Sequence, residues 1–559
     1  MSRLSSLPVL LAGLAGIASY AFSRPMSAAA PPADLVIYGR IWTGDSLQPW
    51  AQALAVSGEK IAAVGDSVAI AKLVGKGTRV IRDGAMVVPG FMDGHTHFIY
   101  GGFQLTQVDL RDAKSPEEFV RRIKNYAAKA KPGEWILGGS WDHERWPGTP
   151  LPDRSWIDSV TPNNPVFVDR LDGHMSLANS VALKLAHIDR STKDVAGGTI
   201  VRRPNGEPTG VVKDVAQNLV YGVQPTPTPQ QSDAAIERAV RWAASKGVTA
   251  VADVSVPWFE VAALKRARAR GTLKTRVAVF VPLQDWHKMA DTVRANGVGD
   301  DWLRVAGVKG YVDGSLGSTT ALFYEPYNDA PQTSGLLVTP EDSLRSWIGS
   351  ADSAGLQVAV HAIGQRANGL LLEIYDSVAQ AHGARDRRFR IEHAQHLRRQ
   401  DIGRIARLGV IASMQPYHAV DDGRWAEKRI GPERIKTTYA FRSLLDAGAR
   451  LAFGSDWTVA PLDPLLGIYA AVTRRTLDGK NPGGWIPEQK ITVEEALRAY
   501  TAGDAYSVFA EQKRGKVAPG YLADIVILDR DLTRVKPETI QEVQVVMTIV
   551  GGKTMYTRQ

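Results

Sequence analysis

Residues 87–98 read Val-Val-Pro-Gly-Phe-Met-Asp-Gly-His-Thr-His-Phe. Alternate residues of a β-strand project to the same face, so His95 and His97 can reach one metal ion while Thr96 points away. A His-x-His pair is a modest signal by itself, because two solvent-facing histidines would leave the same pattern. Its meaning depends on the polar residues that follow other apolar runs of the chain.

Three more polar residues stand directly after apolar runs that are typical of buried strands. They are His361 after residues 356–360, His393 after residues 389–392, and Asp456 after residues 451–455. Barrel enzymes carry their chemistry at the carboxyl ends of the strands. Four histidines and one aspartate in such positions therefore predict a metal site with nitrogen and oxygen ligands.

Strand-like runs alternate with helical patterns through the middle of the chain. The expected strands are residues 135–137, 166–168, 249–253, 275–281, 304–312, 357–360, 390–392, 410–413 and 451–453. This alternation predicts a parallel sheet with crossover helices, and site residues at many strand ends favour a closed (β/α)8 TIM-like barrel. We expect the barrel over residues 88–511. A large insertion at about 98–230 would account for the length beyond the roughly 250 residues of a minimal barrel.

Short strand-like stretches near both ends of the chain predict a second, smaller unit. They are residues 34–38, 51–56, 60–64, 78–81, 523–528 and 543–550. Neither group is long enough to enclose a core of its own. We therefore expect residues 34–87 and 512–559 to pair into one small β-sandwich domain beside the barrel, within the α/β class.

The composition excludes several kinds of protein. The 559 residues include no cysteine, which rules out disulfides, thiolate catalysis and Cys-ligated metal sites. The 67 Lys and Arg outnumber the 58 Asp and Glu but form no dense patch with interleaved aromatic residues. Nucleic acid is therefore not an expected partner.

Residues 1–30 resemble an export signal, with Arg3 as positive charge, an apolar run at 7–22 and small residues at 28–30 for cleavage. The apolar run is shorter than the about 20 residues that span a membrane. We expect a periplasmic or secreted protein with no stable membrane insertion after cleavage. An uncleaved N-terminal membrane anchor is the alternative.

Lys309, which follows the apolar run at 302–308, is surprising near a metal site because an ammonium group repels a cation. Carbon dioxide can convert its amine into a carbamate, which is anionic and can bridge two metals. Otherwise Lys309 is held by a salt bridge, for example to Asp313, and the site suits a single metal.

These motifs together resemble a known family. In chain order they are His95-Thr96-His97, Lys309 with Asp313-Gly314-Ser315-Leu316-Gly317-Ser318, His361-Ala362-Ile363-Gly364, Glu392-His393-Ala394-Gln395, Gly454-Ser455-Asp456 and the closing stretch 515–524. The combination is similar to the amidohydrolase superfamily, and more closely to its YtcJ-like branch, which includes N-substituted formamide deformylase. The similarity covers about residues 34–555. It is specific to the superfamily and much less specific to a substrate.

The resemblance implies a centre of two divalent metal ions, usually zinc. The implied ligands are His95, His97 and Asp456 for the more buried metal, Lys309 as a bridging carbamate, and His361 and His393 for the second metal. Manganese, iron and cobalt fit the same ligands. The branch commonly has Asp where this chain has Gln365, which alters the surroundings of His361 but no ligand.

A metal-based hydrolysis follows from these charges. A divalent metal lowers the pKa of bound water from about 15.7 to about 7, and it polarises the carbonyl of the substrate. Asp456 can take the proton of that water and return it to the leaving nitrogen. We expect cleavage of a C–N bond in a small amide, N-acyl or N-formyl compound. The alternatives are ester, lactone or phosphotriester hydrolysis on the same site, or a non-catalytic periplasmic binding protein.

Other residues are candidates for contact with the substrate. Asp172-Gly173-His174, with Asn179 nearby, also resembles a stretch of the branch, and His174 either reaches the site as a catalytic or substrate-binding donor or stabilises the insertion. Aromatic residues that could line an apolar pocket, or simply pack in the core, are Trp141, Trp146, Tyr417 and Trp457. The sequence leaves the oligomeric state open, a homo-oligomer included.

Overall fold

The computed structural model describes residues 31–559, so the expected export signal at 1–30 lies outside the described residues. Its centre is a parallel barrel of eight strands: β6 (Phe91–Thr96), β13 (Val248–Val254), β14 (Arg276–Pro282), β15 (Leu303–Tyr311), β16 (Gln357–Ala362), β17 (Arg390–His393), β18 (Ile411–Met414) and β19 (Arg450–Phe453). A backbone bridge from Thr96 to Trp457 joins β6 to the segment after β19, so the barrel is nearly closed. The predicted barrel is confirmed.

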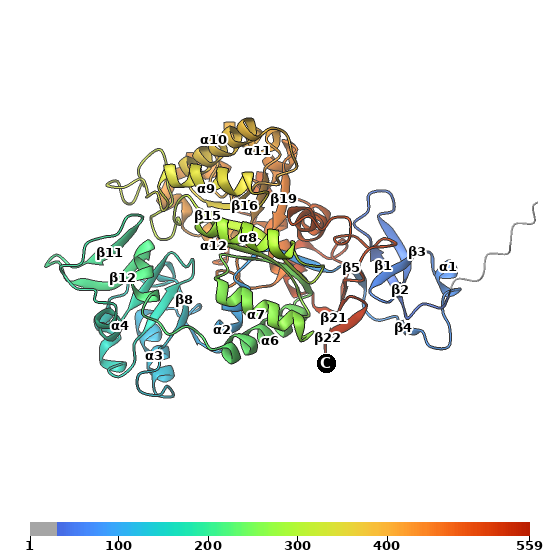
Figure 1. Cartoon of the computed structure of the whole chain (residues 1–559), viewed down its shortest axis with the longest axis horizontal. Coiled ribbons are helices and arrows are strands. Elements are labelled where there is room, and N and C mark those ends of the chain that lie inside the picture. Colours follow the sequence, from blue (N-terminus) through green and yellow to red (C-terminus); the bar gives the residue numbers. More distant parts are fainter. Residues whose placement is uncertain (1–30) are drawn as a thin grey trace, which may run out of the picture.

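Helices that follow the strands in the sequence surround this barrel (Figure 1). They include α6 (Pro229–Ser245), α7 (Trp258–Ala269), α8 (Trp286–Asn296), α9 (Glu341–Ser353), α10 (Gln365–His382), α11 (Arg399–Arg407), α12 (Pro416–Asp422), α13 (Ala426–Arg434), α14 (Phe441–Asp446), α15 (Pro464–Thr473), α16 (Val493–Arg498) and α17 (Asp504–Ser507). Local sequence explains their starts: Thr228 and Gln231 form a capping box ahead of α6, with Pro229 in its first turn. Strands such as β14 are buried almost throughout, which accounts for their continuous apolar sequence.

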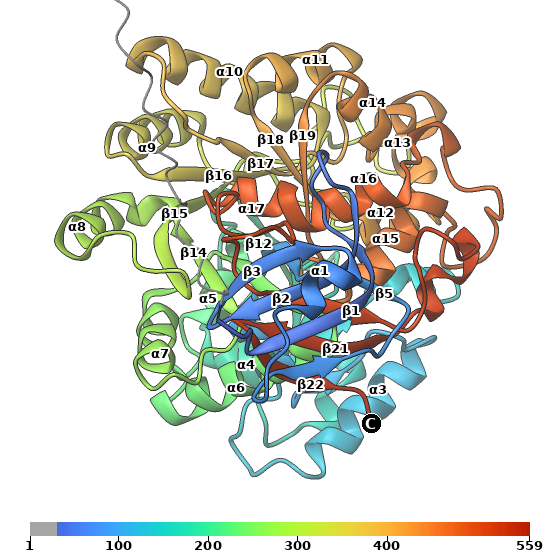
Figure 2. The ribbon, with the colours of Figure 1, turned by 90° about the vertical axis from the view of Figure 1, so that its right-hand side faces the viewer.

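The two ends of the chain form one sheet, as expected. It contains β1 (Leu35–Trp42), β2 (Trp50–Ser57), β3 (Lys60–Gly65), β4 (Arg79–Ile81), β5 (Met86–Pro89), β20 (Ile525–Leu528), β21 (Val545–Val550) and β22 (Lys553–Thr557), with the short helix α1 (Ser67–Ala71) beside it. β5 and β20 are antiparallel neighbours, and Figure 2 shows the blue N-terminal strands next to the red C-terminal ones. A bridge from Lys60 to Leu522 folds the sheet over an apolar core that includes Ile37 and Ile527.

A second sheet lies between β6 and β13 in the sequence, at the opposite end of the barrel from the terminal sheet (Figure 1). It contains β7 (Val108–Asp109), β8 (Gly138–Trp141), β9 (Phe167–Arg170), β10 (Met175–Ala178), β11 (Gly198–Arg202) and β12 (Pro208–Asp214), accompanied by α2 (Phe98–Gln104), α3 (Pro116–Ala127), α4 (Ser180–Leu185) and α5 (Asn218–Tyr221). We call this segment, residues 98–221, the insertion.

Two of the expected central strands belong to the insertion instead of the barrel. Ile136 makes only an isolated bridge to Val166, and residues 167–170 form β9. Both apolar runs face the insertion's own core, where Ile136, Val166 and Val168 are buried. The prediction was wrong because an apolar run reports burial but not which core it is buried in.

Polar contacts fasten the insertion to the barrel. Arg111 donates to the backbone oxygen of Val459 at 2.6 Å, and Arg429 pairs with Glu144 at 2.6 Å. The insertion therefore covers the loops that follow the barrel strands. Over residues 31–559, no helix combines the length and the apolar character that a membrane crossing needs.

Candidate metal centre

The predicted ligands meet at one end of the barrel because each follows or ends a parallel strand. His95 lies near the end of β6 and His97 follows it, while His361 and His393 lie at the ends of β16 and β17. Asp456 stands three residues after β19. In a parallel barrel all carboxyl ends of the strands share one face, so side chains hundreds of residues apart become neighbours.

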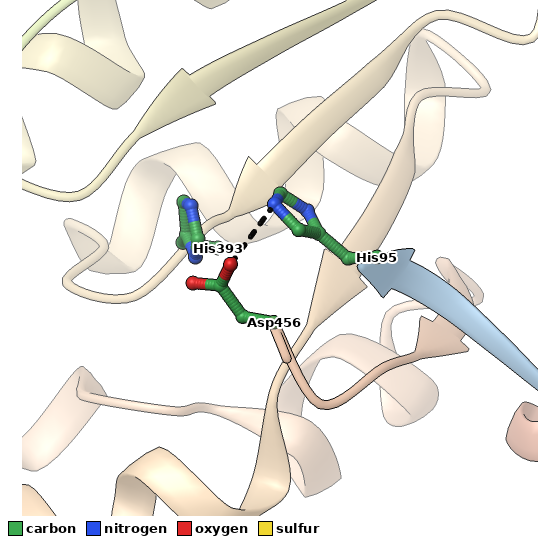
Figure 3. Close-up of side chains that lie close together, drawn as sticks. All are labelled: His95, His393 and Asp456. Atoms are coloured by element: carbon green, nitrogen blue, oxygen red, sulfur yellow. Dashed lines mark ion pairs between the residues drawn. The ribbon is translucent and has the colours of Figure 1, made fainter. Parts of the chain in front are cut away.

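The closest cluster consists of His95, His393 and Asp456, whose ligand atoms lie within 4.8 Å of one another (Figure 3). The Oδ1 atom of Asp456 is 3.5 Å from Nε2 of His95 and 3.2 Å from Nε2 of His97. The ring of His361 adjoins that of His393, with ring centres 4.5 Å apart. The structure thus brings all five predicted His and Asp ligands together.

Two of these residues have a strained backbone. His393 has φ 77° and Asp456 has φ 56°, both in the left-handed region that non-glycine residues seldom adopt. Such conformations cost on the order of 1–3 kcal/mol each and persist only where surrounding structure holds them. Two of the three residues of the cluster are therefore held in such conformations by the structure around them.

Hydrogen bonds behind the cluster orient the imidazoles. Nδ1 of His95 lies 2.5 Å from Oε2 of Glu392, and Nδ1 of His393 lies 2.7 Å from Oε1 of Gln415. Glu392 is in turn held by Arg390 at 2.7 Å. Because the Nδ1 proton is engaged by an oxygen in each case, Nε2 keeps its lone pair for a metal.

The donor set fits a divalent metal ion. Nε2 of His95 is buried and has no hydrogen-bond partner among residues 31–559, a costly state for a polar atom unless a ligand binds it. Burial lowers the pKa of His95 and His393 well below the ordinary value, and the charge of Lys309 acts in the same direction on both, so both rings are neutral at pH 7. Burial raises the pKa of Asp456, but His95 and His97 outweigh it and keep this carboxylate ionised.

Lys309 on β15 lies near enough to the cluster for its charge to act on His95 and His393. Its side chain is buried, the residue being 2% exposed, and its Nζ lies 4.7 Å from the ring centre of Tyr311. The suggested salt bridge to Asp313 is wrong. The Asp313 carboxylate instead accepts the backbone N–H groups of Leu322, Ile363 and Gly364 at 2.7, 3.0 and 2.8 Å.

His174 reaches the cluster from the insertion. Its ring centre is 4.9 Å from that of His361, and its Nδ1 lies 2.6 Å from Oδ1 of Asp214. Burial lowers the pKa of His174, but the Asp214 carboxylate and other acids outweigh it and raise the pKa above the ordinary value. His174 is therefore suited to donate a proton or a hydrogen bond.

A cavity of about 50 Å³ lies between the barrel and the insertion. Its wall includes the predicted residues His361, His393, Asp456, His174 and Asp172.

A family model described as "Amidohydrolase family" matches residues 83–556, which is most of the chain. The chain belongs to the amidohydrolase family.

Individual relatives agree with this assignment. This amidohydrolase is 42% identical to Protein LONG AFTER FAR-RED 3 of Arabidopsis thaliana over 94% of this chain and 93% of that protein. It is 32% identical to the putative amidohydrolase YtcJ of Bacillus subtilis (85% and 90% covered) and 28% identical to the N-substituted formamide deformylase of Arthrobacter pascens (94% and 98% covered). An uncharacterised metal-dependent hydrolase of Pyrococcus horikoshii superposes with a TM-score of 0.73 at 31% identity, over 90% of this chain and 99% of that one.

The aromatic residues expected in the substrate pocket of this amidohydrolase lie elsewhere. Trp141 and Trp146 are buried in the core of the insertion, where Nε1 of Trp141 donates to the Val168 oxygen at 2.9 Å. Trp457 packs against Phe98. Among the described residues, neither Trp457 nor the half-buried Tyr417 lines the cavity. Trp141 and Trp146 thus follow the alternative of core packing, because an aromatic residue near a strand end can turn into the core as easily as into a pocket.

Asn179 and Gln365 have structural contacts. The Asn179 side chain caps α4 by accepting from the Ala182 N–H at 2.9 Å. Gln365 is the first residue of α10, and its side chain donates to the Leu397 oxygen at 3.3 Å.

The amidohydrolase cavity also contains residues that the sequence did not single out. Arg170 pairs with Asp172 at 2.6 Å and with Asp142 at 3.1 Å, and Arg424 pairs with Asp142 at 3.0 Å. His418, on α12 just after β18, lines the cavity as well. The rule that site residues follow strands could have indicated the segment that contains His418. Arg170 and Arg424 line the cavity because the insertion packs against the barrel, and such packing leaves no local pattern in the sequence.

Proposed function

We propose that this amidohydrolase is exported and hydrolyses the C–N bond of a small N-acyl or N-formyl amide, with two zinc ions as its cofactor. The proposal depends chiefly on one observation: Asp456 lies against His95 and His97, within a cluster of buried imidazoles that has a partnerless ring nitrogen. His95, His97 and Asp456 would hold one ion, and His361 and His393 the other. The sequence of residues 1–30 supports export, which N-terminal sequencing of the secreted or periplasmic protein would test.

When bound, a divalent ion supplies a Lewis acid for the substrate carbonyl and acidifies coordinated water to a pKa of about 7. The chain's own residues supply the proton transfers. Asp456 is ionised and takes the proton of the attacking water, then delivers it to the leaving nitrogen. His174, paired with Asp214, donates a hydrogen bond to the substrate from the side of the insertion. Without protonation the amine would be a poor leaving group.

The small cavity and one relative support the choice of substrate class. The cavity next to the cluster is small, with a volume of about 50 Å³. The relative that is 28% identical is named for deformylation of N-substituted formamides. We therefore expect the acyl side of the substrate to be short.

Matched substrates test this function. The substrates are the N-formyl, N-acetyl and N-benzoyl derivatives of one amine, together with the formate ester of the corresponding alcohol. Among the three amides, we expect the N-formyl compound to give the highest kcat/KM. Steady-state kinetics of zinc-loaded protein would measure the series. Turnover of the ester with no amide turnover would instead favour the ester hydrolase alternative.

We also propose that Lys309 is carboxylated, in which form it would help to hold the two ions as an anionic ligand. A buried ammonium with no ion-pair partner among residues 31–559 is unfavourable, whereas an anionic carbamate would balance the metal charge. Lys309→Ala should bind less metal and lose about 100-fold or more of kcat. Added acetate or propionate should restore part of both, because a free carboxylate can occupy the space of the carbamate.

Metal analysis and kinetics with and without propionate would measure this effect. Lys288→Ala, at an exposed position of α8, is the matched control and should behave as the wild type in every assay. Full metal content and activity in Lys309→Ala would contradict this ligand role.

A further inference from the structure

His418 is the second of two imidazoles with a buried, partnerless nitrogen. Among residues 31–559, Nε2 of His95 and Nε2 of His418 are the buried ring nitrogens of histidine that have no hydrogen-bond partner. The metal ligand role accounts for His95. Nothing in the metal centre accounts for His418, although burial of a polar atom without a hydrogen-bond partner is unfavourable.

The position of His418 places it beside the metal cluster but outside it. Its ring is nearly parallel to that of His393, with ring centres 6.4 Å apart and an angle of 14° between the planes. The rings of His95 and His361 lie closer to His393, with centres 4.9 and 4.5 Å away. His418 lines the same cavity as His393 but lies farther from the metal cluster.

Local structure holds His418 in this position. α12 begins at Pro416, directly after Gln415, and the backbone N–H of His418 donates to the Gln415 oxygen at 3.1 Å. Gln415 itself contacts His393 through its side chain. The residue is 9% exposed, so its ring has little freedom to turn toward solvent.

Other hydrogen-bond acceptors that line the cavity are already paired with arginine side chains. Asp142 is paired with Arg170 and Arg424, Asp172 is paired with Arg170, and Asp421 is paired with Arg424. A neutral imidazole, by contrast, offers one lone pair and one N–H. His418 is therefore free to bond a polar group of the substrate.

We propose that His418 is a substrate-binding residue that accepts a hydrogen bond from the N–H of the scissile amide. This inference rests on the proposed function and narrows it to secondary amides, R–CO–NH–R′. In the proposed reaction the cluster of His95, His393 and Asp456 acts on the acyl carbon, and the amide nitrogen is bonded to that carbon. His418 lines the same cavity as His393 and Asp456, so we place the N–H of the amide against it. The hydrogen bond fixes the N–H and leaves the lone pair of the nitrogen for the proton from Asp456.

This contact would discriminate between classes of substrate. A tertiary amide has no N–H, and its nitrogen lone pair is delocalised into the carbonyl, so it forms no bond with either tautomer of His418. The alkoxy oxygen of an ester has no proton and is a weak acceptor. A site whose buried polar group is left without a partner rejects such analogues.

Calorimetry with two matched inhibitors tests the proposal without relying on turnover. An alkyl phosphonamidate (P–NH–R) and the phosphonate ester with the same alkyl group (P–O–R) differ only in the N–H. Zinc-loaded wild type should bind the phosphonamidate at least about tenfold more tightly, and His418→Phe should lose that preference while binding the ester within about threefold of wild type. His418→Leu provides a second, smaller replacement, and His287→Gln, at an exposed position of α8, is the matched control.

Two further readouts separate this role from other roles of His418. Zinc content should be unchanged in His418→Phe, because the residue is not a ligand, and the melting temperature should not fall, because the buried nitrogen has no partner to lose. Equal affinity of wild type for both inhibitors, or retained preference in His418→Phe and His418→Leu, would overturn the proposal while leaving the proposed function standing. Failure of both inhibitors to bind, together with no amide turnover, would overturn the two together.

Discussion

Removing divalent metal with a chelator should abolish hydrolysis, and returning zinc should restore it. The residues of the cluster offer buried nitrogen and oxygen lone pairs at one point, and Nε2 of His95 has no other partner in the described part of the chain. Without a Lewis acid, water keeps a pKa of about 15.7 and is a poor nucleophile at neutral pH. We therefore expect kcat to fall to the background rate, the largest effect among these predictions.

Loss of metal should also lower stability. A ligand that binds only the native state, present at about 1,000 times its Kd, contributes about 4 kcal/mol to the free energy of unfolding. Elemental analysis, kcat and melting temperature should be measured on the same samples before chelation, after it, and after reconstitution with zinc, manganese or cobalt. Full activity at undetectable metal content would refute the metal centre.

Asp456→Asn should lower kcat by a factor of about 10²–10⁴, the usual contribution of a positioned acid or base. Asparagine has nearly the same shape as aspartate and can still coordinate through its carbonyl oxygen, but it cannot take up the proton of water. His95 and His97 hold the Asp456 carboxylate ionised, which makes it available for this role. The loss should appear in kcat more than in KM, because the proton moves in the transition state.

Metal content decides how this variant is interpreted. Asp456→Asn with two bound ions and a large loss of kcat supports proton transfer by Asp456, whereas a parallel loss of metal identifies the residue as a ligand alone. Asp463→Asn, at the N-terminal cap of α15, is a control outside the cavity lining. Turnover at the wild-type rate by metal-loaded Asp456→Asn would contradict the mechanism, and binding without turnover in the wild type would favour the binding-protein alternative.

Sequence patterns predicted the barrel and its ligands because both depend on local order. His361, His393 and Asp456 each stand at or just after the end of an apolar run that is a barrel strand in the structure. The parallel arrangement then brings these ends together without further information. His418 also follows a barrel strand, β18, but it stands four residues after Met414 and inside α12, so its position in the sequence alone does not mark it as a site residue.

Contacts between distant segments were harder to predict. Lys309 and Asp313 are four residues apart, which suggested a pair, yet backbone amides from the loop before α9 and from the turn after β16 occupy the Asp313 carboxylate. Trp141 stands next to polar residues in sequence, but β8 turns it into the core of the insertion.

The sequence alone determined that this chain is a barrel hydrolase with a histidine-rich metal centre. It contains both the order of the strand ends and the identity of the polar residues at them. Hydrophobic periodicity and residue type are local properties, so they survive in the linear chain. Only the tertiary structure decided what surrounds that centre: His174 and Arg170 reach it from the insertion, and the nitrogen of His418 is left without a partner. These features depend on how the insertion packs against the barrel, which no local pattern encodes.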